Sequence, residues 1–209
     1  PEFSREFFAT AVREAPLADL PLLEGEGLDA FIERIQPLIF DPGVAPKKVS
    51  LDDASGDIIK ASATNFYEGV TQAEVESFYE AMKDPSDSTP ISYGLNSKVV
   101  RGPDGSVSEQ VYRIGGMYSA ALEKIVYWLE KAAEVAETPR QQQAIRTLIS
   151  YYQTGDLEEF DEFNVLWVSD LQPMVDFVNG FTEVYGDPLG MKATWEAVVN
   201  FKDMHATHR

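Results

Sequence analysis

One turn constrains the fold of this chain more than any other feature of its sequence. The tetrapeptide Gly102–Gly105 (Gly-Pro-Asp-Gly) lies between two runs rich in β-branched residues, 91–100 and 107–114. Proline and aspartate favour tight turns, and glycine supplies the positive φ that such turns need. The pattern predicts an antiparallel β-hairpin and excludes an all-helical fold.

Apolar residues recur at helical spacing on both sides of this hairpin. The predicted helices begin just after Ser4, Gly27, Thr71, Gly116, Thr138 and Asp156. The first of them is expected to bury Phe7, Phe8 and Val12. A further helix is predicted within 170–179, and further strands at 57–67 and 195–201, the last one buried. No internal repeat or low-complexity linker divides the chain, so we expect one α+β domain, predominantly helical with a small antiparallel sheet.

The charge balance bears on the possible partners. Seventeen basic residues against thirty-five acidic ones give a net charge of -18. Such a field repels polyphosphates, so we expect no nucleic-acid partner. It attracts cations such as the amino terminus of a peptide, although acidic side chains also serve simply to keep a surface soluble. No apolar run approaches the ~20 residues of a membrane span, so no membrane partner is expected.

The absence of cysteine excludes disulfides, thiolate zinc sites and cysteine nucleophiles, but it does not fix the compartment. The sequence begins at Pro1 without a methionine and without a signal peptide. We therefore expect an excised or proteolytic piece of a longer protein. A cytoplasmic location is favoured, and export of the parent protein stays open.

Three side chains near the C-terminal end form the main candidate site. Glu183 and Tyr185 stand two positions apart, so in an extended segment they point to the same face. A turn-forming stretch, 186–190, could fold Glu196 back beside them. Two carboxylates and a phenol would suit a protonated amine, which offers three donors. The same carboxylates could instead act on a glycosidic bond, or be two solvated surface groups.

Two further patterns are weaker. His205 and His208, the two histidines of the chain, would share a face on a helix. A hydrolytic zinc site needs a third ligand, and a metalloprotease helix carries a glutamate between its histidines, so a surface role is expected for this pair. The segment 65–71 (Asn-Phe-Tyr-Glu-Gly-Val-Thr) joins a predicted strand to a helix and could line a groove. Packing is the expected role of its aromatic residues.

The segment 179–190 (Asn-Gly-Phe-Thr-Glu-Val-Tyr-Gly-Asp-Pro-Leu-Gly) resembles the Gly-Phe-x-Glu-x-Tyr-x-Asp-Pro-x-Gly motif of the dipeptidyl peptidase III family. The stretch 195–203 is especially similar to the bacterial branch. The likeness extends upstream through 65–71, 92–97, 124–129 and 163–168, and so covers essentially the whole chain. The Glu-x-Tyr-x-Asp-Pro block is the specific part of this resemblance.

The resemblance implies a two-lobed zinc peptidase that releases dipeptides from the amino termini of short peptides. The substrate would lie between a helical zinc lobe and a lobe built on a small β-barrel core. Residues 1–209 would be a single lobe, most of the non-zinc one, with its sheet forming part of the barrel. The resemblance assigns the substrate's amino group to Glu183 and Tyr185, with Glu196 assisting, and it places Trp167 along the cleft.

The chain departs from the family at the zinc site. The family's ligands and general base come from a helical His-Glu-x-x-x-His segment and a later Glu-Glu-x-x-Ala/Arg-x-Glu/Asp helix, and neither occurs here. Zinc is therefore expected in the intact parent enzyme and not on this piece, which should be inactive without the missing zinc lobe. A non-catalytic acidic module that binds a partner, or is structural, stays open as the alternative.

Overall fold

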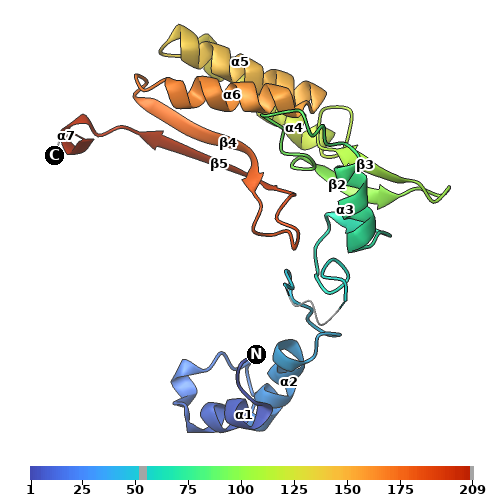
Figure 1. The fold of residues 1–209 in the computed structure, drawn as a ribbon. Coiled ribbons are helices and arrows are strands. Elements are labelled where there is room, and N and C mark those ends of the chain that lie inside the picture. The colour runs from blue at the N-terminus through green and yellow to red at the C-terminus, as the bar shows by residue number, and fades with distance from the viewer. Residues whose placement is uncertain (52–55, 208–209) are drawn as a thin grey trace.

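The structure is a computed structural model that describes residues 1–51 and 56–207 (Figure 1). Its helices are α1 (Arg5–Glu14), α2 (Leu28–Phe40), α3 (Gln72–Glu80), α4 (Ser119–Glu134), α5 (Pro139–Thr154), α6 (Leu157–Ser169) and α7 (Met204–Thr207), with a 3-10 turn at Leu17–Asp19. Its strands are β1 (Tyr67–Glu68), β2 (Ser97–Arg101), β3 (Val107–Val111), β4 (Val175–Glu183) and β5 (Thr194–Phe201). This mixture confirms the α+β class, and within the described residues the strands form two small sheets and no closed barrel.

The hairpin predicted from the turn Gly102–Gly105 is confirmed. Strands β2 and β3 pair antiparallel, with Arg101 opposite Val107, and β1 adds to β2 in parallel. The turn is closed by the Gly102 amide, which donates to the Ser106 carbonyl over 2.8 Å. Gly105 adopts a φ of 84°, which an L side chain rarely takes.

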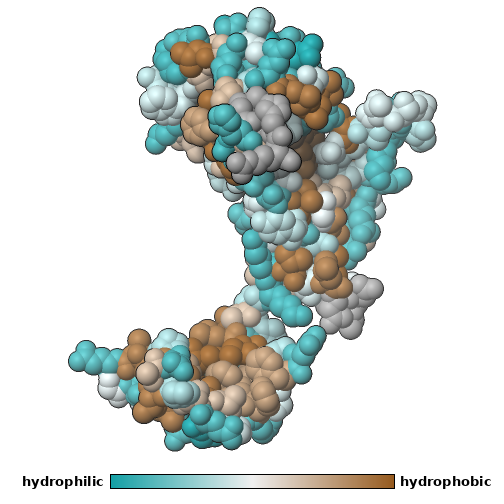
Figure 2. Space-filling model, turned by 90° about the vertical axis from the view of Figure 1, so that its left-hand side faces the viewer, coloured by the Kyte–Doolittle hydropathy of each residue, from teal (hydrophilic) through white to brown (hydrophobic). Residues whose placement is uncertain are grey.

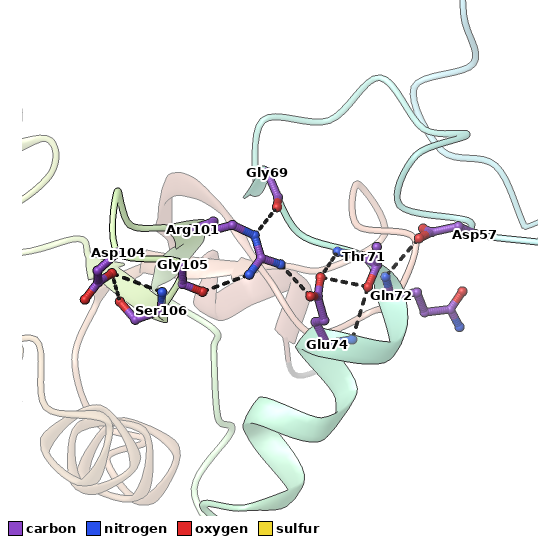
Figure 3. Close-up of polar contacts among 9 residues, drawn as sticks. All are labelled: Asp57, Gly69, Thr71, Gln72, Glu74, Arg101, Asp104, Gly105 and Ser106. Atoms are coloured by element: carbon purple, nitrogen blue, oxygen red, sulfur yellow. Dashed lines mark hydrogen bonds and ion pairs between the residues drawn. The ribbon is translucent and has the colours of Figure 1, made fainter.

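Arg101 joins this hairpin to the start of α3 (Figure 3). Its guanidinium donates to the carbonyls of Gly69 and Gly105 and forms an ion pair with Glu74. Glu74 also accepts from the Thr71 amide, while the Thr71 hydroxyl accepts from the Glu74 amide. This reciprocal pair is the predicted capping box, so the helix begins where the sequence indicates.

The largest core lies among α4, α5, α6 and the β4–β5 hairpin. Helix α5 packs between α4 and α6, and the hairpin runs alongside α6 (Figure 1). Leu148, Tyr151 and Tyr152 on α5 are fully buried at its centre. Phe181 of β4 packs in the same cluster, so the strand that ends at Glu183 rests on this helical layer.

The N-terminal pair α1–α2 has a small core of its own, built on Val12, Phe31 and Ile32. In Figure 1 the pair stands apart from the other helices, and in Figure 2 hydrophobic side chains gather on its surface. Phe7 is 63 % exposed, so the expectation that α1 buries it is wrong. The Ser4 cap predicted for α1 is confirmed, because the Ser4 hydroxyl accepts from the Phe7 amide over 3.1 Å. That residues 1–209 form one lobe stays a prediction.

The predicted strand at 57–67 is wrong except at its last residue. The described part of this segment folds into turns, and β1 begins only at Tyr67. Asp57 accepts from the Lys60 amide, and Ser62 donates to the Ile58 carbonyl. Such local bonds compete with a β-ladder and hold the backbone in turns.

The predicted helix within 170–179 is wrong as well, because β4 begins at Val175. The Glu137 carboxylate accepts from the backbone amides of Met174 and Val175, each over 2.8 Å. Antiparallel pairing with β5 then continues the extended backbone. Strand β5 itself is confirmed, but it is not buried, since Phe201 is 78 % exposed. Within the described residues, no helix is long and apolar enough to span a membrane.

Candidate functional site

The β4–β5 hairpin positions the two predicted carboxylates. Its register pairs Gly180 with Glu196 and, further along, Glu183 with Thr194. Between these pairs the register shifts, because β4 has one extra residue, Thr182. The hairpin therefore contains a β-bulge at the end of β4.

The bulge decides which way Glu183 points. In a regular strand, Thr182 would share a face with Gly180 and Glu196, and Glu183 would lie on the opposite face. The extra residue instead sets Glu183 opposite Thr194, two positions from Glu196 and on its face. The Thr182 hydroxyl also donates to the Glu196 carboxylate over 2.9 Å. Both carboxylates thus come together by a mechanism that the sequence analysis missed.

The electrostatics of this pair favour a cation. Both Glu183 and Glu196 are half-buried. Burial raises the pKa of the Glu183 carboxyl, and the negative charge of Glu196 and a hydrogen bond with it raise that pKa further. Two carboxylates that resist ionising together are stabilised by a positive group placed between them.

Tyr185 is placed differently from the prediction. Strand β4 ends at Glu183, so the alternation argument does not extend to Tyr185, which lies in the following turn and is 76 % exposed. Among the described residues, no hydrogen bond joins its hydroxyl to Glu183 or Glu196. Its role in binding stays a prediction.

Trp167 lies at the opposite end of the hairpin. It is in the last turn of α6, and its indole N–H donates to Asp176 over 2.8 Å. Asp176 pairs with Asn200 and lies seven positions before Glu183 in β4, about 23 Å of strand. The structure does not bring Trp167 together with the carboxylates, and its role as a cleft residue also stays a prediction.

The other face of the hairpin borders an apolar groove. Two adjoining cavities of about 620 and 410 Å³ share Lys124, Ile125 and Trp195 in their walls. Trp195 precedes Glu196 on the strand, so it faces the opposite side of the sheet. The groove and the carboxylate pair are therefore separated by the hairpin.

The histidine pair does not form a metal site in the described part of the chain. His205 is exposed on α7, and His208 lies outside the described residues. Residues 1–51 and 56–207 contain no group of three or more histidine, cysteine, aspartate or glutamate side chains that could hold a metal ion.

Comparison with known proteins identifies the family. The sequence model of peptidase family M49 matches residues 94–209, more than half of the chain. The chain belongs to this family. Human dipeptidyl peptidase 3 is 28 % identical over 162 residues, which cover 73 % of this chain and 21 % of the human protein. The rat dipeptidyl peptidase 3 is 35 % identical over 94 residues, 44 % of this chain and 13 % of the rat protein.

Two solved structures are similar to this chain in fold. The dipeptidyl-peptidase III from Corallococcus sp. strain EGB has a TM-score of 0.53 at 26 % identity, over 69 % of this chain and 26 % of that one. DPP III from Caldithrix abyssi has a TM-score of 0.55 at 20 % identity, over 98 % of this chain and 36 % of that one, which supports the fold. The M49 chain described here spans about a fifth of the human relative.

The sequence analysis missed a buried polar network that joins the M49-matched region to residues before it. Asp187 and Lys192, in the loop between β4 and β5, are 3 % and 0 % exposed. Lys192 donates to the hydroxyl of Tyr79 over 2.6 Å, and Asp187 accepts from the hydroxyl of Tyr67 over 2.9 Å. The sequence signal for Asp187 is the Asp-Pro pair of the family motif, while Lys192 carries no signal of its own.

Burial of Lys192 should make the stability of the M49 chain depend on pH. Burial lowers the pKa of Lys192 to about 8, against the opposing charges of Glu109 and Asp187. Between this pKa and the ordinary value of about 10.4, the unfolded chain binds more protons, so the free energy of unfolding rises with pH. We expect the wild type to gain about 2 kcal/mol over Lys192→Met between pH 8 and pH 10. Urea unfolding at several pH values measures this difference.

Two buried tyrosines lower the stability of the wild type above pH 10, an effect that the Lys192→Met variant shares. Burial raises the pKa values of Tyr67 and Tyr79 above their ordinary range, so above pH 10 the unfolded state loses protons that the folded state keeps. A difference between wild type and Lys192→Met that stays constant from pH 8 to pH 10 would contradict the assignment.

Proposed function

We propose that this chain supplies the substrate-binding part of a zinc-dependent dipeptidyl peptidase, in which Glu183 and Glu196 hold the free amino group of a short peptide. The observation that carries the proposal is the bulge at Thr182, which brings both carboxylates to one face of the hairpin. Membership of peptidase family M49 and the relatives named dipeptidyl peptidase 3 support the reaction class.

The chemistry of the pair suits an ammonium group. An ammonium has three N–H donors and a positive charge, and the two carboxylates offer acceptors and negative charge. The raised pKa of Glu183 indicates that the pair is stabilised when a cation arrives. We propose Tyr185, on the adjacent turn, as a further acceptor and Trp167 as a contact for more distant parts of the peptide.

Anchoring the amino terminus would account for the release of dipeptides. A fixed distance between the amine site and the catalytic centre selects the peptide bond that is cut. The described residues of this chain do not fit a zinc site, because they contain no group of three or more histidine, cysteine, aspartate or glutamate side chains that could hold a metal ion. We therefore propose that zinc and the zinc lobe belong to other parts of the parent enzyme, and that residues 1–209 are most of the non-zinc lobe. A cytoplasmic location stays a prediction.

The test is Glu183→Gln in the intact peptidase. The amide keeps the size of the side chain but removes its charge, so transition-state binding should weaken by about 2 kcal/mol, roughly thirtyfold in kcat/KM. Glu162→Gln is the matched control, since Glu162 is an exposed glutamate on α6 and should leave kcat/KM unchanged. An unaltered kcat/KM in Glu183→Gln contradicts the proposal.

The alternative of a non-catalytic acidic module predicts a different binding pattern. Calorimetry with a short peptide and with its N-acetylated form separates the two. An amine site binds the acetylated peptide more weakly, and Glu183→Gln removes much of that preference. An acidic surface without a site responds only to the total charge of the peptide, whichever residue is changed.

A further inference from the structure

The loop between β4 and β5 is fixed from within by Asp187. One carboxylate oxygen of this residue accepts from the amides of Met191 and Lys192, over 2.8 and 2.9 Å, and from the Tyr67 hydroxyl. The other oxygen accepts from the Leu189 amide over 3.3 Å. Asp187 therefore folds the loop on itself and ties it to β1.

Lys192 ties the same loop to a second set of elements. Its ammonium donates to the Tyr79 hydroxyl of α3, to the Gly94 carbonyl over 3.1 Å, and to the Ser97 hydroxyl of β2 over 3.0 Å. These three bonds use all the N–H groups of the ammonium. Glu109 of β3 accepts from the hydroxyls of both Tyr79 and Ser97, so these two hydroxyls connect its carboxylate to the Lys192 ammonium.

This network holds the loop that joins the two strands of the carboxylate pair. Glu183 precedes the loop, and Thr194, its partner in register, follows it. Strand β5 is largely exposed, so packing contributes little to holding it in register. The conformation of a hairpin's connecting segment sets the register of its strands, and a shift of one residue reverses the faces of the side chains.

We propose that Lys192 and Asp187 are positioning residues for the amine site. They hold the loop so that β5 starts in the register that turns Glu183 toward Glu196. Neither side chain contacts the substrate, because both are buried within the network. This inference rests on the proposed function and deepens it by naming what holds the site in shape.

The first experiment is Lys192→Met in the intact peptidase. We expect KM for a free-amine peptide to rise about tenfold with kcat within about twofold, because a displaced anchor weakens binding of the amino group. Leu148→Ala is the matched control, since it creates a cavity in the core without touching the loop. A destabilised enzyme with an intact site loses active protein and therefore apparent kcat, while its KM is unchanged. A KM unchanged in Lys192→Met overturns the inference.

A double-mutant cycle separates this inference from the proposed function. If Lys192 acts through Glu183, Lys192→Met should raise KM much less in a Glu183→Gln background than in the wild type. Fully additive effects contradict positioning. If Glu183→Gln alone has no effect on kcat/KM, the proposed function itself fails.

Tyr79→Phe serves if Lys192→Met does not fold. It removes one acceptor from the Lys192 ammonium and keeps the aromatic ring in place. The expected result is a smaller rise in KM, about threefold, which is again reduced in the Glu183→Gln background. A KM equal to that of the wild type in a folded Tyr79→Phe enzyme counts against positioning.

Discussion

Insertion of one alanine between Thr194 and Trp195 should abolish recognition of a free amino group, because it gives Thr182 a partner in β5 and so removes the bulge that turns Glu183 toward Glu196. Once the extra residue has a partner, the alternation of the strand directs Glu183 to the opposite face of the hairpin. We expect kcat/KM of the intact peptidase for a free-amine peptide to fall by about 100-fold or more. Steady-state kinetics with the insertion variant measures this loss.

Thr182→Ala is the control for this insertion. It keeps the number of residues in β4, and hence the bulge, but removes the hydroxyl that donates to Glu196. We expect its kcat/KM to fall by no more than about fivefold. Circular dichroism would establish that both variants fold. A folded insertion variant with the kinetics of Thr182→Ala would show that the bulge does not orient the site.

Asp187→Ala should produce the largest loss of stability. The change leaves the Tyr67 hydroxyl and the amides of Met191 and Lys192 without their acceptor in a buried region. Unpaired buried donors are costly, and we expect the free energy of unfolding to fall by about 3 kcal/mol. For a chain of this length, Tm should fall by roughly 10 °C. Differential scanning calorimetry of the chain measures the shift.

Two further variants serve as comparisons for Asp187→Ala. Asp187→Asn keeps one oxygen acceptor, so it should lose about half as much stability as Asp187→Ala. Asp104 also accepts from backbone and hydroxyl groups, but in the exposed turn of the β2–β3 hairpin. Asp104→Ala should therefore lower Tm only slightly. Equal losses for Asp187→Ala and Asp104→Ala would contradict the importance of burial at Asp187.

The elements that the sequence predicted correctly are those with local causes. The Gly102–Gly105 turn, the Thr71 capping box and the Ser4 cap depend on residues within a few positions of one another. The first part of β4, residues 175–179, was predicted as a helix because its extended backbone depends on distant partners. Glu137, about 37 residues away, holds its first amides, and β5 pairs with the rest.

In the candidate site, too, the features with local causes were predicted and those that depend on distant segments were not. The motif containing Glu183 indicated the residues, and spacing indicated that carboxylates could meet an ammonium. The alternation argument joined Glu183 to Tyr185, whereas the structure joins Glu183 to Glu196 through a bulge. A bulge leaves no pattern in one strand alone, since it depends on the register with a second strand. The partners of Lys192 could not be predicted either, because they come from distant segments.

Those distant partners also limit how the β4–β5 loop could be exchanged between relatives. Tyr79, Gly94 and Ser97 lie 113, 98 and 95 positions before Lys192 in the sequence. A chimaera that receives only the loop of another family member would place a foreign side chain among hydroxyls arranged for a lysine. The unit that can be transplanted is therefore not a contiguous stretch of polypeptide. It is the loop together with the three positions that surround its ammonium.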